Sequence, residues 1–361
     1  VAILTLAAWG AGRLVVSRWL DSDPLALDAI ALILLAGVST LIVTAGSLAV
    51  LHLLRPAFVL SALGAWACVG ALSIHGDGPF RELLGGLKPH PWFLVILLAG
   101  GLSLAAATTF ASFYDQWHYH LGFPYHWLRA GTVVDFPRQA YSFFPSNMGL
   151  LYTYALSGPG GWGAQVIHWW MGVLAAAGSA AIAYRLGAGI AGRTLAAAVF
   201  LATPSVVSMG ALAGSDLGVA AFAVGGVLAV LRIFSKPEHS TAMATMAGLA
   251  AGLAAGCKYT ALATVVPPLG IAVVVTAGVV SGQDRRWRKV VTATITFGLS
   301  TGVVLAPWLI RNTAATGNPV YPYFAEAFSG AENAANETDN EVASGIGGFG
   351  VSSNKVVAAL T

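Results

Sequence analysis

Long apolar runs separated by short polar segments dominate the chain. A helix needs about 20 apolar residues to cross a bilayer, and runs of about that length predict ten spans. The run 241–256 is short and rich in Gly and Ala, a composition typical of a helix packed tightly between neighbours. The ten ranges are 1–17, 28–53, 57–75, 91–113, 164–185, 194–212, 216–234, 241–256, 259–280 and 290–310. The pattern therefore predicts an all-α polytopic membrane protein.

Composition supports this fold class and excludes others. The chain has 361 residues, of which 18 are Lys or Arg and 15 are Asp or Glu, so 9% are charged. A soluble domain has roughly 25% charged residues. Hydrophobic residues make up 57%, more than a soluble chain of this size can bury. These values exclude a soluble enzyme, a disordered protein and a nucleic-acid binder. The two cysteines permit one bridge at most, too few for a disulfide framework.

The basic residues predict an orientation. Lys and Arg concentrate in cytoplasmic loops, and their densest cluster follows the ninth predicted span, so this loop is placed in the cytoplasm. Counting spans outward puts the loop 114–163 and the tail 311–361 on the outer side. Six of the 18 basic residues then lie outside, namely Arg55, Arg129, Arg138, Lys258, Arg311 and Lys355.

The loop 114–163 is the most unusual part of the chain. It opens YDQWHYHLGFPYHWLRAG and mixes Trp, Tyr and His with charges, as segments at the membrane interface do. Residues 147–157 are apolar but too short to cross, which predicts an interfacial or re-entrant helix. His168, beside two tryptophans, is interpreted as an interface anchor.

Two carboxylates are predicted at the outer boundary. Asp115 follows the span that ends near Phe113, and Asp216 begins the span 216–234. An acid at a helix N-terminus interacts favourably with the helix dipole, so capping alone is one interpretation of Asp216. The other is chemical, because two carboxylates at one depth could activate a hydroxyl and hold an acceptor.

Two cations are predicted in the same layer, Lys258 and Arg311. Long cationic side chains near span ends often extend to the interface without further function. Alternatively, both hold a phosphate, with Arg129 and Arg138 joining from the loop.

Histidines in the loop raise the question of a metal. Asp115, His118 and His120 form a D-x-x-H-x-H pattern that could ligate a divalent cation. No standard zinc spacing is present, and hydrogen bonding at the interface is the alternative interpretation. No cofactor is predicted, and a divalent metal at His118 and His120 is the alternative.

Four stretches, in order, resemble the GT-C superfamily of membrane glycosyltransferases. They are YDQWHYHLGFP, SFFPSNMGLLYTYAL, GSDLGVAAF and PWLIRNTAATGNPVYPYF, with GCKYTALA between the last two. The likeness is to the bacterial branch similar to protein O-mannosyltransferases and lipid A aminoarabinose transferases, glycosyltransferase family 39-like. It covers about residues 91–325, which implies a transmembrane core there. Residues 1–90 are then spans outside the match, and 326–361 form an acidic, mobile outer segment.

The resemblance implies an inverting transferase of a bacterial inner membrane. It would move a sugar from a polyprenyl-phosphate carrier in the lipid to an acceptor at the outer face. Asp115 matches the family's catalytic acid and would be the general base, and Asp216 matches a recurrent acid. Cations would stabilise the charge that grows on the leaving phosphate. The predicted substrate- and phosphate-binding residues are Tyr119, His120, Arg129, Arg138, Lys258 and Arg311.

Two other functions remain open. Many family members carry a second acid where Gln116 follows Asp115. This departure leaves open a chain without catalysis that serves as a structural subunit beside a membrane protein partner. A lipid or amphiphile transporter is the third interpretation. A transporter is expected to carry ionisable residues at mid-depth, whereas here the polar residues gather at one boundary.

Overall fold

The computed structural model describes residues 1–17, 20, 27–75, 90–111, 113–158, 163–282 and 286–328. Contacts divide the chain into two compact units. The first comprises Val1–Val134 and Pro145–Leu305, and the second Asp135–Phe144 and Ala306–Thr361. Most of the predicted acidic segment 326–361, from residue 329 on, lies outside the described residues.

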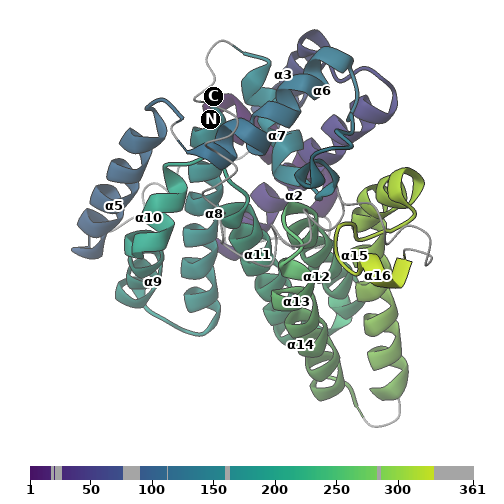
Figure 1. The fold of residues 1–361 in the computed structure, drawn as a ribbon. Helices are drawn as coiled ribbons and strands as arrows, with labels where there is room; N and C mark the ends of the chain where they lie inside the picture. The colour runs from purple at the N-terminus through teal and green to yellow at the C-terminus, as the bar shows by residue number, and fades with distance from the viewer. Residues whose placement is uncertain are drawn as a thin grey trace, which may run out of the picture. The chain divides into compact units, whose positions relative to one another are not determined.

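The first unit is a helical bundle, drawn in Figure 1, in which α11 packs against both α8 and α12. The long helix α15 (Arg286–Thr316) begins in this unit and ends in the second, which also holds η3 (Ala140–Phe143) and α16 (Ala325–Phe328). The other helices of the first unit are α1 (Ala2–Val16), α2 (Leu27–Val50), α3 (Pro56–His75), α5 (Trp92–Ala107), η2 (Gln116–His120), α6 (Gly122–Ala130), α7 (Asn147–Leu156), α8 (Gly163–Arg185), α9 (Ile190–Ala202), α10 (Pro204–Gly210), α11 (Asp216–Ser235), η4 (Pro237–His239), α12 (Ser240–Cys257), α13 (Ala261–Thr264) and α14 (Val266–Val279).

The predicted fold class is confirmed within the described ranges, whose elements are helices apart from an isolated bridge between Leu54 and Gly131. Seven of these helical segments are long and apolar enough to cross a membrane, or eight if α9 and α10, bent by 65°, form one broken span. Helices α1 and α5 are apolar but have only 15 and 16 residues. The protein is therefore membrane-embedded, and the predicted count of ten spans is not confirmed.

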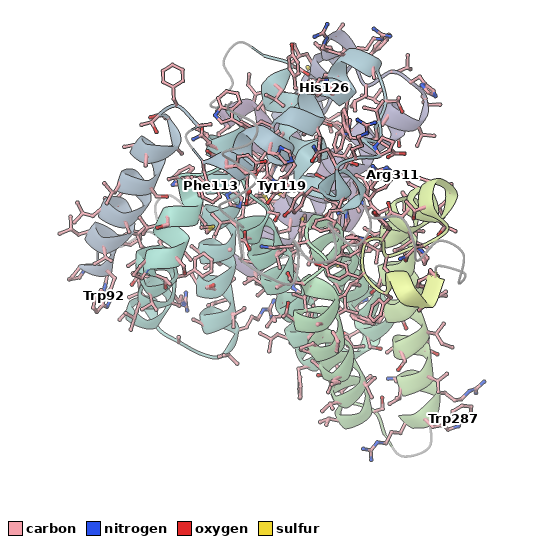
Figure 2. All side chains as sticks on the ribbon, in the orientation of Figure 1. Trp92, Phe113, Tyr119, His126, Trp287 and Arg311 are labelled. Carbon is pink, nitrogen blue, oxygen red and sulfur yellow. The ribbon has the colours of Figure 1, made fainter. Side chains whose placement is uncertain are left out.

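Exposed tryptophans mark helix ends in the first unit. Figure 2 labels Trp92 at the start of α5 and Trp287 at the start of α15, and both side chains are exposed. Tryptophan prefers the membrane–water interface, where its ring meets both lipid and water. Both positions suit helices that begin at such an interface.

Glycine lets α12 approach α15 closely. A Cβ at Gly248 would lie 2.3 Å from the carbonyl oxygen of Phe297, and one at Gly252 would lie 2.6 Å from that of Thr301. The Thr301 hydroxyl donates to the Gly248 carbonyl at 3.0 Å. The tight packing predicted for the Gly- and Ala-rich run 241–256 is therefore confirmed.

A buried ion-pair cluster joins α2, α8 and α11. Asp28 is fully buried, and its Oδ2 accepts from Arg185 Nε and from Arg232 Nε, each at 2.7 Å. Arg185 Nη2 donates to the same oxygen. Both arginines lie near the ends of predicted spans, and the structure uses them to hold three helices together.

Replacing Asp28 by Ala should cost about 3–5 kcal/mol in the free energy of unfolding, because buried Arg232 and partly buried Arg185 would be left close together without a counter-charge. The control is Asp216→Ala, since Asp216 is 47% exposed in its pair with Lys258. An exposed pair contributes about 1 kcal/mol or less. Unfolding of the purified protein in detergent measures both changes. Similar costs would show that the Asp28 cluster does not hold the helices together.

Candidate functional site

An ion pair lies where α11 begins and α12 ends. The two helices form an antiparallel hairpin, so Asp216, the first residue of α11, meets Lys258, which follows the last residue of α12. Lys258 Nζ donates to Asp216 Oδ1 at 2.8 Å, and the side chains are 43% and 47% exposed. Each charge also suits the dipole of its own helix end. The two helix dipoles therefore favour both charges, and both side chains remain accessible to a ligand.

His120 reaches the same place from the π-helical turn η2. Burial lowers the pKa of His120 from 6.5 to about 3, nearby His168 and Lys258 act in the same direction, and Asp216 opposes them. His120 is therefore a neutral hydrogen-bonding group at physiological pH. Its ring contacts that of Tyr119, with centroids 4.3 Å apart. The structure thus brings four predicted site residues together: Tyr119, His120, Asp216 and Lys258.

Asp115 directly precedes this turn. The Leu121 N–H donates to the Gln116 carbonyl at 2.8 Å, an i→i+5 bond that places residues five apart on roughly one side of the turn. Asp115 and His120 are five apart. Within the described part of the chain, the Asp115 carboxylate has no hydrogen bond or ion pair. It therefore keeps its full capacity to accept protons and hydrogen bonds.

The span before Asp115 ends earlier than predicted. Helix α5 stops at Ala107 rather than near Phe113. The hydroxyls of Thr108 and Thr109 donate to the Ala105 and Ala106 carbonyls, which are among the last acceptors of the helix. Such local side-chain bonds compete with helix continuation. Asp115 is consequently separated from the helix end by seven residues.

Buried side chains hold the chain between α10 and α11. His168 Nδ1 lies 2.9 Å from the Met209 carbonyl and 2.7 Å from that of Leu212. Because carbonyls only accept, these partners assign the proton to Nδ1. Nε2 is then free to accept the Leu217 N–H at 3.0 Å, at the start of α11. His168 is fully buried, so its interpretation as an interface anchor is wrong.

Two further groups hold the same segment. The Tyr152 hydroxyl donates to the Gly214 carbonyl, and Gln165 Nε2 donates to the Ala211 carbonyl at 3.1 Å. Burial raises the pKa of Tyr152, so its hydroxyl remains a donor. Tyr152 lies on α7, which forms where the sequence predicts a short helix. Most residues of α7 are buried, so this helix is not interfacial. These contacts position Asp216, and the apolar context of Tyr152 and Gln165 gave no sign of this role.

Arg311, labelled in Figure 2, lies in the second unit. There it contacts a carboxylate, a carbonyl and two aromatic rings. Its Nε donates to Asp135 Oδ1 at 2.7 Å, and its Nη2 donates to the Ser142 carbonyl. The guanidinium also lies 5.6 Å from the ring centroids of Phe143 and Trp308. Nη1 is buried and finds no hydrogen-bond partner among the described residues. Asp135 thus neutralises Arg311, and one buried donor is left without a partner among the described residues.

The remaining predicted residues do not join either cluster. Arg129 lies over the ring of Tyr125 at 5.8 Å in the first unit, and Arg138 is an exposed residue of the second unit. Lys258 and Arg311 belong to different units, and each pairs with a carboxylate. The phosphate site shared by these cations therefore remains a prediction.

The described residues contain no cluster of metal-ligating side chains that would support the alternative of a metal at His118 and His120. His118 stacks on Tyr114, with ring centroids 5.0 Å apart. In the part of the chain that the structure describes, no three His, Cys, Asp or Glu side chains gather closely enough to hold a metal ion.

An apolar groove of about 330 Å³ runs along α12. One face of α12, from Ala242 to Leu253, lines it together with residues of α2 and α11. Leu253 is five residues before Lys258, or about 7 Å along a helix. One lining residue of the groove therefore lies within two helical turns of Lys258.

The chain matches no protein-family model, no curated protein and no solved structure. The residues and their geometry are therefore the basis for assigning a function.

The neutral state of His120 predicts a pH dependence of stability. Unfolding exposes the imidazole and restores a pKa near 6.5, whereas the folded value is about 3. Between these values the unfolded state binds more protons, so the free energy of unfolding should fall as pH drops from about 6.5 toward 3. The slope from this group is at most about 1.4 kcal/mol per pH unit.

The measurement is chemical unfolding in detergent at several pH values, with wild type beside His120→Gln. The variant lacks the titrating group, so its stability should fall less steeply with acidification. Parallel curves for the two proteins would contradict a neutral, partly buried His120.

Proposed function

We propose that the protein is an inverting glycosyltransferase that uses a polyprenyl-phosphate sugar as donor. One observation carries the proposal: Asp115, a carboxylate without a partner among the described residues, lies one turn from His120 at the end of a membrane bundle that also holds Asp216 and Lys258. The sequence stretches that resemble the GT-C superfamily add support. The acceptor is unidentified, and the proposed location is the outer face of a bacterial inner membrane.

Asp115 is the general base in this proposal. It takes the proton of the acceptor hydroxyl while the hydroxyl oxygen attacks the anomeric carbon of the sugar. The bond between that carbon and the phosphate oxygen breaks as the new bond forms, and its electron pair leaves on the phosphate. Direct displacement inverts the anomeric carbon. The proton ends on Asp115 and passes to water, since the carboxylate is partly exposed.

Lys258 is the proposed partner of the leaving phosphate. Its present partner is Asp216 at 2.8 Å, but about half of each side chain is exposed. Such pairs contribute little free energy, so a phosphate can replace the carboxylate at small cost. Charge-assisted hydrogen bonds to phosphate are among the stronger polar contacts. Asp216 would then be free to accept hydrogen bonds from sugar hydroxyls.

The groove along α12 is the proposed place for the polyprenyl chain. Its lining is almost entirely apolar, with Phe222 and Leu253 among its residues. A lipid tail in it would lie beside α2 and α11, with its phosphate directed to the end that carries Lys258. Exposed aromatic residues near Asp115, such as Tyr114 and Trp117, suit an adjacent membrane interface.

Replacing Asp115 by Asn should lower sugar transfer about 10²- to 10⁴-fold, the usual contribution of a general base. Donor binding should persist, because Asn keeps the size of Asp and Lys258 is untouched. The measurement is loss of radiolabelled sugar from a panel of polyprenyl-phosphate donors in liposomes, together with donor retention by the purified protein.

Glu238→Gln is the matched control, since Glu238 is an exposed acid in η4 at the opposite end of the α11–α12 hairpin. This variant should transfer at the wild-type rate. Equal activity of wild type and Asp115→Asn would reject Asp115 as the base. Intact donor across the whole panel, with folded wild-type protein, would favour a structural subunit. Movement of lipid without cleavage would favour a transporter.

A further inference from the structure

The turn between α2 and α3 lies at a boundary of the membrane. Both helices are long and apolar enough to cross a bilayer, so residues 51–55 between them lie at its surface. Helix α2 ends in a Schellman motif, in which the Leu53 N–H donates to the Leu48 carbonyl at 2.7 Å. His52, with φ of 58°, occupies the left-handed position of this motif. The connection is therefore a defined turn rather than an irregular loop.

The C-terminal end of α6 packs on this turn. The Leu54 N–H donates to the Gly131 carbonyl at 2.8 Å, and this bond forms the isolated bridge between the two segments. Gly131 has φ of 81°, and a Cβ there would lie 2.8 Å from the His52 carbonyl oxygen. Glycine is thus required both by the backbone conformation and by the close approach. The same Cβ would lie 3.2 Å from Arg55 Nε, so the Arg55 side chain lies against Gly131.

This packing brings two guanidinium groups to one corner of the first unit. Arg129 is two residues before Gly131, in the last turn of α6, and lies 5.8 Å from the ring centroid of Tyr125. Arg55 and Arg129 are both exposed. Among the described residues, neither guanidinium has a hydrogen bond or an ion pair. The corner therefore carries two positive charges that no carboxylate neutralises.

Apolar side chains flank the turn on both sides. Val50 and Leu51 precede it, Phe58 follows it, and all three are exposed. A phospholipid combines apolar chains with a phosphate at the membrane surface, and the planar guanidinium of Arg presents parallel donors to phosphate oxygens. A zwitterionic headgroup would also bring an ammonium close to two arginines without an acid to pair it. The charges of the corner therefore favour a headgroup with a net negative charge.

We infer that the corner formed by Arg55 and Arg129 binds the phosphate of an anionic phospholipid. The phosphate accepts hydrogen bonds from the guanidinium groups, and the acyl chains lie along the apolar residues that flank the turn. Basic residues at a membrane surface attract anionic lipids in general. This corner differs because the bridge at Gly131 holds two unpaired guanidinium groups near each other. The inference uses none of the groups proposed for sugar transfer and does not depend on that activity.

Binding of tritiated dioleoylphosphatidylglycerol to the purified protein in a neutral detergent tests the inference. Unlabelled phosphatidylglycerol should displace the probe about tenfold more effectively than dioleoylphosphatidylcholine, which has the same acyl chains and an added ammonium. Inorganic phosphate at equal ionic strength should displace little of the probe, because it brings no acyl chains. Equal competition by the two lipids, displacement by inorganic phosphate, or no saturable binding would overturn the inference.

Three variants locate the binding. Arg55→Gln and Arg129→Gln should each weaken phosphatidylglycerol binding about fivefold, the usual contribution of one arginine at a membrane surface. Both side chains are exposed, so these substitutions should leave the protein folded. Arg138→Gln is the control, because it removes one exposed positive charge from the second unit and should bind the lipid as wild type does. An equal loss in the control, or no loss in either corner variant, would contradict the assignment.

Discussion

Helix α11 begins at one end of the helical bundle, and buried side chains beneath it must satisfy the backbone of the segment that leads into it. Within a membrane, unpaired backbone groups find no water to bond. The bend of 65° between α9 and α10, followed by a non-helical segment, leaves several such groups. His168, Gln165 and Tyr152 bond four carbonyls and one N–H of this segment. The position of Asp216, and with it the ion pair to Lys258, depends on these contacts.

The two ends of α11 use charge in opposite ways. Near one end, Arg232 joins the buried cluster of Asp28, where removal of a partner is costly. At the other end, Asp216 forms an exposed pair that contributes little to stability. The two residues are 16 positions apart, about 24 Å along a helix. One end is therefore fixed to its neighbours, while the other can exchange its partner for a ligand at little cost to the fold.

Local patterns in the sequence predicted the helices and placed two charged residues at one membrane boundary. They did not predict which side chains would pair. The positions of α2, α8, α11 and α12 follow from apolar runs, and alternation of spans placed Asp216 and Lys258 at one boundary. The partners of Asp28 are 157 and 204 residues away, and hydropathy carries no information on such pairs. His168 looked interfacial because of its tryptophan neighbours. Its bonds to α10 and α11 depend on a bend in the chain. The hydropathy pattern instead predicts a continuous helix there.

The structure also gives a physical meaning to Gln116, the residue that departs from the pattern of the resembled family. Gln116 is 1% exposed, and its Oε1 accepts the Phe113 N–H at 3.3 Å. A carboxylate at this position would be stripped of water, which is costly without a counter-charge. The amide forms this bond without burying a charge, and it stabilises the turn from which Asp115 extends. Gln116 therefore acts on the backbone of the turn, and its presence is compatible with Asp115 as a proton acceptor.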